Sequence, residues 1–361
     1  MEKEKIILDV DTGSDDAVAI ICALLSNEFD VLGICTVSGN VNIDNATDNT
    51  LRVVDYLNSS VKVYKGASLP LASTLIPWGI QGLTLPHNEI RLDDSKRIHP
   101  DHLPLPKPNI TYEDKSAVIW LIETLLKQED HSVTLVPVGP LTNIALAIRS
   151  DERILKKIKR IVLMGGSHDV YAPTQGAEFN IWVDPEAAEI VINSGLDVTM
   201  VSLDATSCIC LDYNEAKRIR DINTRAAIFV ADMIEQRLNA AKKTMNKQAG
   251  QVVGIALHDP LAVCAIKHPE VLTDIWDTSC HIDLGRSYAY GETVLGRNYQ
   301  SEINEKGEYV NLPNNIHYVR KANKEIFFNW LYNLLVEDTK WLKRFILRVD
   351  VFGELKKHLN Y

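Results

Sequence analysis

Leu8-Asp9-Val10-Asp11-Thr12-Gly13-Ser14-Asp15-Asp16-Ala17 is the stretch that decides the fold of this chain. It follows the strand-like run Lys5-Ile6-Ile7-Leu8 and precedes an apolar helical run from Ala17 to Leu25, which predicts a turn between a buried strand and a helix. Four carboxylates lie within eight residues of this turn. Because they repel one another, we expect a neutralising partner, and a hard divalent cation with oxygen ligands fits best. In the alternative, Ser14 or Asp15 only caps the helix, but a cap uses one or two carboxylates and not four.

Composition and charge limit the classes of protein to consider. The 361 residues, 46% hydrophobic and 24% charged, are enough for one large α/β domain or two modest ones. The net charge of −10 argues against nucleic acids and anionic membranes as partners. The polar start, Met1 to Lys5, leads directly into a strand and predicts no signal peptide, and no apolar run reaches the roughly 18 residues of a membrane span. The six cysteines are scattered, and most of them are typical of buried thiols, so we expect a reducing, cytoplasmic location.

Strand-like and helical runs alternate from the start of the chain. The strand-like runs are Ile6–Val10, Val31–Val37, Val61–Tyr64, Ser132–Val138, Ile158–Met164 and Asp197–Leu203. The helical runs between most of them are Asp16–Ser26, Ile43–Leu57, Lys115–Lys127, Leu141–Arg149 and Pro185–Asn193. Near-continuous apolar strands separated by helices predict an α/β fold, an open, mostly parallel twisted sheet with helices on both faces.

Glycine-bearing strand ends indicate where a ligand binds. In open parallel sheets, ligands bind at the carboxyl ends of the strands. The acidic turn lies at one such end, and the others are Ser38-Gly39-Asn40, Val138-Gly139-Pro140 and Met164-Gly165-Gly166-Ser167. We therefore expect these four segments to converge on one crevice.

The remainder of the chain predicts a lid loop and a small C-terminal extension. Leu69 to Tyr112 is a long irregular segment with seven prolines, which is typical of a functional flap. Further helices and short strands are expected at Thr224–Lys243, His258–Lys267, Ser279–Leu284 and His317–Val319, before two terminal helices. We predict a single domain over residues 1–361, with the lid at 69–112 and C-terminal strands and helices over 270–361.

Two further polar segments are candidates for the site. Glu178-Phe179-Asn180 lies in a predicted extended piece, so Glu178 and Asn180 would share one side and face a polyhydroxylated ligand. Asp184 before Pro185 predicts the N-cap and the first residue of a helix. His258-Asp259-Pro260 also precedes a helix, and Asp259 is either a cap of the same kind or a site residue.

Taken in order, these motifs resemble those of the nucleoside hydrolase family, the inosine-uridine preferring nucleoside N-ribohydrolases. The resemblance spans roughly residues 5 to 340. It implies calcium-dependent hydrolysis of the N-glycosidic bond of ribonucleosides to ribose and a free nucleobase, by a homodimer or homotetramer. The matching motifs are Asp9-x-Asp11-x-x-x-Asp15-Asp16, Gly39-Asn40, Val136-Pro137-Val138-Gly139-Pro140-Leu141-Thr142-Asn143, Met164-Gly165-Gly166, Glu178-Phe179-Asn180 and His258-Asp259-Pro260.

The resemblance also implies a role for each matching residue. The carboxylates of Asp11, Asp16 and Asp259 and the backbone carbonyl of Val138 would bind Ca2+. Asp11 would also be the general base toward the attacking water, and His258 would assist departure of the base, unless it is only packed beside Asp259. The residues expected to orient the turn or bind the ribose are Asp9, for the turn, and Asp15, Asn40, Met164, Glu178 and Asn180, for the sugar.

The base side departs from the family pattern. Pyrimidine-accepting members often have a His-Gly pair in the lid, where this chain has Gln81-Gly82, although His87 lies nearby and could substitute. Trp78 could stack on a base, or it could only anchor the lid by packing. Loss of a proton donor together with a stacking Trp favours purine or modified purine ribonucleosides over pyrimidines.

Several alternatives remain open at this point. Ala172 replaces an Asn that contacts the 5′-hydroxyl in many relatives, and Gln175 or Tyr171 could take its place. Within the family, the alternative is a pyrimidine or broad-specificity hydrolase. Outside it, a non-catalytic calcium-dependent ribose-binding protein would also need the acidic turn. A haloacid-dehalogenase-type phosphatase opens with Asp-x-Asp too, but it needs Thr or Val where this chain has Gly13.

Overall fold

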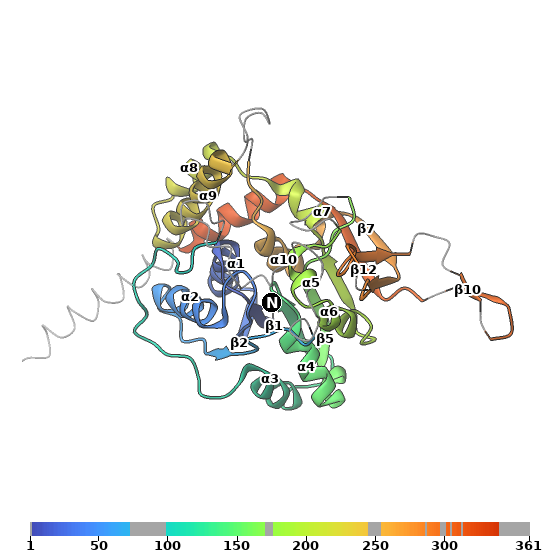
Figure 1. Cartoon of the computed structure of the whole chain (residues 1–361). Coiled ribbons are helices and arrows are strands. Elements are labelled where there is room, and N and C mark those ends of the chain that lie inside the picture. The colour runs from blue at the N-terminus through green and yellow to red at the C-terminus, as the bar shows by residue number, and fades with distance from the viewer. Residues whose placement is uncertain are drawn as a thin grey trace, which may run out of the picture.

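The strand that precedes the acidic turn, β1 (Glu4–Val10), lies inside an eight-stranded sheet (Figure 1). The structure is a computed structural model that describes residues 2–72, 99–169, 176–244, 254–285, 287–296, 301–303, 305–311 and 313–338. Within them the strand order is β3-β2-β1-β4-β5-β6-β12-β7, and only the pairing of β12 with β7 is antiparallel. The other strands are β2 (Phe29–Thr36), β3 (Val63–Lys65), β4 (Val133–Pro137), β5 (Ile158–Met164), β6 (Val198–Val201), β7 (Leu272–Thr278) and β12 (Ile316–Ala322). The prediction of a mostly parallel α/β sheet is confirmed.

Helices cover both faces of this sheet because its central strands are apolar on both sides. Side chains alternate along a strand, so Ile6, Leu8 and Val10 enter one core and Ile7 enters the other. The first core includes residues of α1, α2, α9 and α10, and the second includes residues of α3, α4 and α6. The helices are α1 (Ser14–Leu25), α2 (Ile43–Tyr56), α3 (Ala117–Leu126), α4 (Thr142–Ser150), α5 (Phe179–Val183), α6 (Pro185–Ile192), α7 (Leu203–Thr206), α8 (Tyr213–Arg220), α9 (Arg225–Thr244) and α10 (His258–Lys267).

The C-terminal segment differs from the sequence-based expectation. It supplies two strands to the main sheet, an interior strand β12 and the edge strand β7, and β7 was not predicted. The expected strand near residues 279–284 is β8 (Cys280–Ile282), which pairs with β9 (Thr293–Leu295) outside the main sheet, and β10 (Ser301–Ile303) pairs with β11 (Tyr309–Asn311). A helix follows over 324–338, and the second expected terminal helix falls outside the described residues, as does most of the expected lid.

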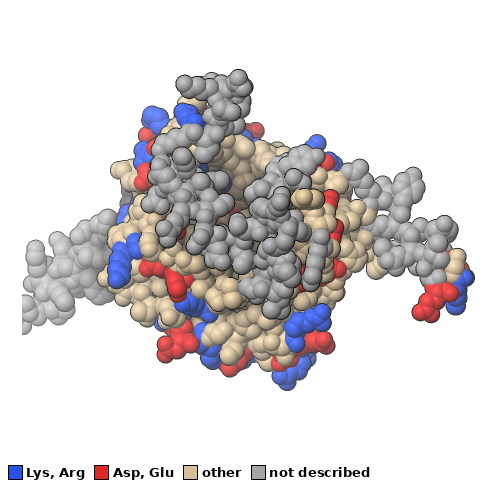
Figure 2. All heavy atoms as spheres, viewed as in Figure 1, with Lys and Arg blue, Asp and Glu red and all other residues tan. Residues whose placement is uncertain are grey.

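Surface charge is dispersed on the face that Figure 2 shows. Around its rim, Lys and Arg side chains alternate with Asp and Glu side chains in small groups. Ion pairs are also found between exposed side chains, such as Arg153 with Asp151 and Lys217 with Asp221. Among the described helices, none is both long and apolar enough to cross a bilayer. The densest group of carboxylates instead lies inside the molecule, at the turn after β1.

Candidate active site

The acidic turn occupies the carboxyl end of β1, between two parallel neighbours. Asp9, Asp11, Asp15 and Asp16 are all buried, with at most 3% of each residue exposed. Helix α1 starts with Gly13 as its N-cap, and Asp16 closes the first turn: Oδ2 accepts from the Gly13 N–H at 2.9 Å and Oδ1 from the Asp11 N–H at 3.1 Å. The cap therefore uses Asp16, not Ser14 or Asp15, and it leaves three carboxylates for other purposes.

Asp9 points away from the other three carboxylates and holds the turn in the sheet. Its Oδ1 accepts from Asn143 Nδ2 at 2.8 Å, and the same amide group donates to the Thr36 carbonyl of β2 at 2.9 Å. Asn143 lies in the first turn of α4, so this contact joins β1, β2 and α4 at one point. Burial raises the pKa of Asp9 to about 7, against a smaller opposing effect of the Asn143 hydrogen bond. These contacts fit the expected orienting role.

Asp11 is held by the loop after β2. The Asn40 backbone N–H donates to Asp11 Oδ2, and the Asn40 side-chain amide lies 3.2 Å from Asp11 Oδ1 and 3.1 Å from Asp16 Oδ2. A Cβ at Gly39 would lie 1.9 Å from Asp11 Oδ2, so only glycine permits this approach of the backbone. The Ser38-Gly39-Asn40 strand end thus meets the acidic turn as predicted.

Asp259 reaches the same place from the other end of the chain. It lies in the first turn of α10, whose N-cap is Leu257, so the interpretation of Asp259 as the N-cap is wrong. Helices α1 and α10 pack together, and carboxylate oxygens of Asp15, Asp16 and Asp259 lie within 4.8 Å of one another. Among the described residues this group contains Asp15, which was expected at the ribose, rather than Asp11, which was expected at the metal.

The electrostatics of this cluster favour a bound cation. Burial and the neighbouring charges of Asp15 and Asp16 raise the pKa of Asp259 well above its usual value, and burial and the charge of Asp16 do the same to Asp11. Burial and the charge of Asp15 raise the pKa of Asp16 to about 6. Asp15 Oδ1 is buried and has no hydrogen-bond partner among the residues described. A buried, all-oxygen donor set suits a hard divalent cation, which would reverse these pKa shifts.

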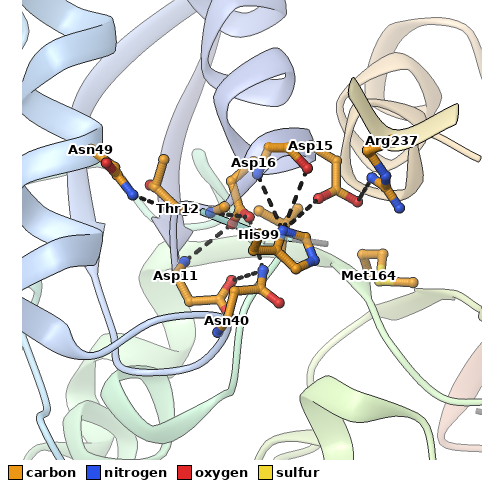
Figure 3. A network of polar contacts seen from close by, with 12 residues as sticks. Asp11, Thr12, Asp15, Asp16, Asn40, Asn49, His99, Met164 and Arg237 are labelled. Atoms are coloured by element: carbon orange, nitrogen blue, oxygen red, sulfur yellow. Dashed lines mark hydrogen bonds and ion pairs between the residues drawn. The ribbon is translucent and has the colours of Figure 1, made fainter. Parts of the chain in front are cut away.

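Asp15 lies between two residues that the sequence analysis missed, Arg237 and His99 (Figure 3). Arg237 Nη1 of α9 is 2.8 Å from Asp15 Oδ2. His99 Nδ1 is 3.8 Å from Asp15 Oδ1 and accepts from the Ser14 N–H at 3.2 Å. Although His99 follows a polar stretch of the sequence, its side chain is only 20% exposed.

A sequence pattern could have identified Arg237, whereas none indicated His99. Arg237 follows Met233 by four residues and Val230 by seven, so it interrupts the apolar stripe of α9 with a charge. A charge in a buried stripe indicates a partner, although not which one. His99 lies in an irregular segment, and its position depends on contacts with distant residues.

The residues that were expected to bind the ribose, Met164, Glu178 and Asn180, gather at the ends of β4 and β5. Residues 179–183 form the short helix α5 rather than the predicted extended piece, and Glu178 is its N-cap. Glu178 Oε2 accepts from the backbone N–H groups of Gly166 at 3.1 Å and Asn180 at 3.0 Å. Burial raises the pKa of Glu178 to about 7, against these hydrogen bonds. Asn180 Nδ2 donates to the Val138 carbonyl at 2.9 Å and the Met164 carbonyl at 3.1 Å, so these three predicted residues meet.

His258 lies beside the carboxylate cluster at the start of α10. Its Nδ1 is 2.7 Å from Thr206 Oγ1, and burial, aided by the charge of Arg237, lowers its pKa to about 4. The ring is therefore neutral at pH 7.

Asp184 is the N-cap of α6 with Pro185 following, as predicted. The predictions for base and 5′-hydroxyl contacts fall outside the described residues: Trp78, Gln81, Gly82, His87, Tyr171, Ala172 and Gln175.

The chain is similar to known nucleoside hydrolases over most of its length. The family model described as inosine-uridine preferring nucleoside hydrolase matches residues 6–329. The pyrimidine-specific ribonucleoside hydrolase RihA of Escherichia coli O81 (strain ED1a) is 35% identical over 295 residues, 81% of this chain and 89% of RihA. RihA of Shewanella sp. (strain MR-4) is 38% identical over 293 residues, 81% of this chain and 86% of that protein. The solved structure of a purine-preferring ribonucleoside hydrolase from Gardnerella vaginalis has a TM-score of 0.75 and 31% identity, and the match covers 92% of this chain and 99% of that chain.

Proposed function

The chain belongs to the inosine-uridine preferring nucleoside hydrolase family and is a hydrolase of N-glycosyl bonds, and we propose that it hydrolyses ribonucleosides with calcium as its cofactor. The observation that supports this best is the buried carboxylate cluster at the end of β1, with Asp259 added by α10. Asp11, Asp16 and Asp259 would hold the ion with the Val138 carbonyl. Bound there, calcium supplies Lewis acidity toward the attacking water and the ribose hydroxyls.

The chain's own residues would perform the remaining steps. Asp11, held by Asn40, accepts a proton from the attacking water. Asp15 holds ribose hydroxyls through its unpartnered oxygen, and Asn40, Met164, Glu178 and Asn180 line the sugar. Cleavage passes through an oxocarbenium-like transition state, and the negative cluster stabilises its positive charge.

Departure of the base is assigned to His258. Its Nδ1 is engaged with Thr206, which leaves Nε2 for the leaving base. On this basis, together with Trp78 and Gln81 of the lid, the proposed substrates are purine or modified purine ribonucleosides.

His99 favours a second candidate, a hydrolase that accepts pyrimidine ribonucleosides. A backbone N–H can only donate, so His99 Nδ1 accepts from Ser14 and the neutral ring carries its hydrogen on Nε2. Burial lowers the pKa of His99 to about 4, so the ring is neutral at pH 7. A second histidine donor beside the cluster is what a pyrimidine leaving group needs. The names of the two RihA relatives favour the same candidate.

A panel of nucleosides tests the function and separates the two candidates. We expect the purified protein with calcium to release free base from ribonucleosides and to act poorly on 2′-deoxynucleosides, since loss of the 2′-hydroxyl leaves buried polar groups unpaired. A higher kcat/KM for inosine or adenosine than for uridine supports purine preference. The reverse order supports the pyrimidine candidate and identifies His99 as the donor to examine.

Replacement of Asp11 tests the mechanism. We expect Asp11→Ala to lower kcat by about 10³-fold or more, because both a metal ligand and the base are lost. Asp30→Ala, at an exposed position of β2, is the matched control and should leave kcat unchanged. Near-normal turnover by a folded Asp11→Ala protein would contradict the assignment.

The assembly and location belong to the same proposal. We infer a homodimer or homotetramer in the cytoplasm, as the family resemblance and the scattered thiols imply. Sedimentation of the purified protein measures the oligomeric state, and fractionation of the source cells measures the location.

A further inference from the structure

Arg237 is a buried cation whose position needs an explanation. Only 9% of the residue is exposed, and it lies on α9 among the buried apolar residues Val230, Met233, Ile234 and Leu238. Burial of an unpaired guanidinium costs free energy, so the buried Arg237 side chain needs an anionic partner. In the described part of the chain, its ion-pair partner is Asp15, 2.8 Å away.

This contact divides the two oxygens of Asp15. Oδ2 faces Arg237, whereas Oδ1 faces His99 Nδ1 at 3.8 Å and lacks a hydrogen-bond partner among the described residues (Figure 3). Asp15 also lies close enough to Asp16 and Asp259 to be a third carboxylate ligand of one cation. It is therefore the one member of this group whose carboxylate is already neutralised by a protein cation.

We propose that Arg237 is a positioning residue that withholds Asp15 from the metal and presents the free Asp15 oxygen to the sugar. The proposal rests on the proposed function and deepens it, because it states why adjacent carboxylates of one turn serve different ligands. A guanidinium 2.8 Å from Oδ2 repels a nearby divalent cation and attracts this carboxylate oxygen toward α9. Asp16, which has backbone N–H groups as partners and no cation beside it among the described contacts, remains the metal ligand.

The electrostatics of Asp15 agree with this arrangement. Burial raises the pKa of Asp15, but the contacts with Arg237 and the nearby His99 and His258 together lower it below its usual value. Asp11, Asp16 and Asp259 shift in the opposite direction.

In the competing explanation, the ion pair between Arg237 and Asp15 only links α9 to α1 and has no effect on how Asp15 binds ligands. The two explanations differ in what happens when the charge is removed. If the ion pair only links the helices, its loss lowers the stability of the fold and weakens the binding of calcium and of the sugar together. Loss of a positioning charge frees Asp15 to join the metal, so calcium binds more tightly while the sugar binds more weakly.

Arg237→Met tests this difference, because Met keeps an apolar stem and removes the charge. Calcium affinity is measured by calorimetry on the metal-free protein, and KM and kcat are measured for a ribonucleoside substrate at saturating calcium. We expect calcium affinity to rise about tenfold and KM to rise about tenfold or more, with a smaller change in kcat. Arg237→Lys restores a cation and should return both quantities toward wild type. If Arg237→Met does not fold, Arg237→Gln replaces it in the same measurements.

Arg220→Met is the matched control. Arg220 of α8 also forms ion pairs with α9, to Asp232 at 2.8 Å and Glu235 at 2.9 Å, but away from the cluster and 35% exposed. Calcium affinity that falls or stays unchanged in Arg237→Met overturns the proposal, and so does a KM change that Arg220→Met reproduces. If the wild type hydrolyses no ribonucleoside, the proposed function fails, and the calcium affinities alone then support or overturn the role of Arg237.

Discussion

Neighbouring carboxyl groups of one turn differ in pKa because their partners differ. Asp15 and Asp16 are adjacent, yet the pKa of Asp15 is lowered and that of Asp16 is raised to about 6. Successive residues of a helix point in directions about 100° apart, so the two side chains reach different partners, Arg237 for Asp15 and the turn's own N–H groups for Asp16. Environments that separate the pKa values of nearby groups are typical of sites where such groups have different roles.

Glu178 leads to a prediction about pH at the residue scale. Its pKa rises from 4.5 to about 7 on folding, so the unfolded chain loses this proton first as the pH rises. The stability that Glu178 contributes is therefore present below pH 4.5 and lost between pH 4.5 and 7. We expect the unfolding free energy of the wild type, relative to Glu178→Gln, to fall by up to about 3 kcal/mol across that range.

Urea unfolding of both proteins with a chelator present measures this difference without a contribution from metal binding. Gln is the matched replacement because its carbonyl oxygen can still accept from the Gly166 and Asn180 N–H groups. A difference between the two proteins that does not change with pH would refute the prediction.

At the scale of elements, Asn49 of α2 joins the acidic turn to the segment that carries His99. Its Nδ2 donates to the Thr12 carbonyl at 3.0 Å and the Asp101 carbonyl at 3.2 Å, and its Oδ1 accepts from the Leu103 N–H at 2.8 Å. Asn49 is fully buried, so no water replaces these contacts if the side chain is removed. One helix thereby sets the separation of two segments that are far apart in sequence.

We therefore expect Asn49→Ala to lower the unfolding free energy by about 2–4 kcal/mol, because three backbone groups lose a buried partner. It should also raise KM for the nucleoside, since both Thr12 and residues 101–103 lose their anchor. Chemical unfolding and steady-state kinetics measure the two effects. Asn45→Ala, the same change at a less buried position of α2, is the control. Equal stability losses in the two variants would show that the anchoring contacts contribute nothing.

At the scale of the whole molecule, the last described strand completes the sheet that the first strand begins. β12 lies between β6 and β7, so residues 316–322 are interior although they follow β6 by more than a hundred residues. Ser202 Oγ donates to the Val319 carbonyl, and Tyr318 Oη donates to Asp204 at 2.6 Å, which fastens β12 to the segment after β6. The C-terminal region is thus part of the main sheet.

Two paired residues of this region test its role. Val319 on β12 is fully buried, and Ile275, its partner in register on the edge strand β7, is 45% exposed. We expect Val319→Asp to destabilise the fold by more than about 4 kcal/mol, because an unpaired carboxylate enters the core, and Ile275→Asp to cost about 1 kcal/mol or less. Thermal unfolding measures the melting temperatures of both variants. Similar melting temperatures would mean that β12 is not an interior strand.

The sequence by itself determined the features that arise between near neighbours in the chain. Apolar runs of strand and helix length predicted the parallel sheet, and the strand-turn-helix pattern placed the carboxylates of Asp9 to Asp16 at one strand end. It also predicted the Asp184 cap, because capping depends on residues within one helical turn. It failed where a local choice depended on distant partners, as for Glu178, whose carboxylate caps α5 while it also accepts from Gly166.

Only the tertiary structure decided which distant groups meet. The approach of Asp259 to Asp16, of Arg237 to Asp15 and of His99 to the acidic turn depends on how α1, α9 and α10 pack on one face of the sheet. The insertion of β12 beside β6 likewise requires contacts between remote strands. Helix packing and strand pairing depend on the summed burial of many side chains, and no short motif contains that sum. The acidic turn was therefore visible in the sequence, whereas the contacts of Asp15 with Arg237 and His99 were not.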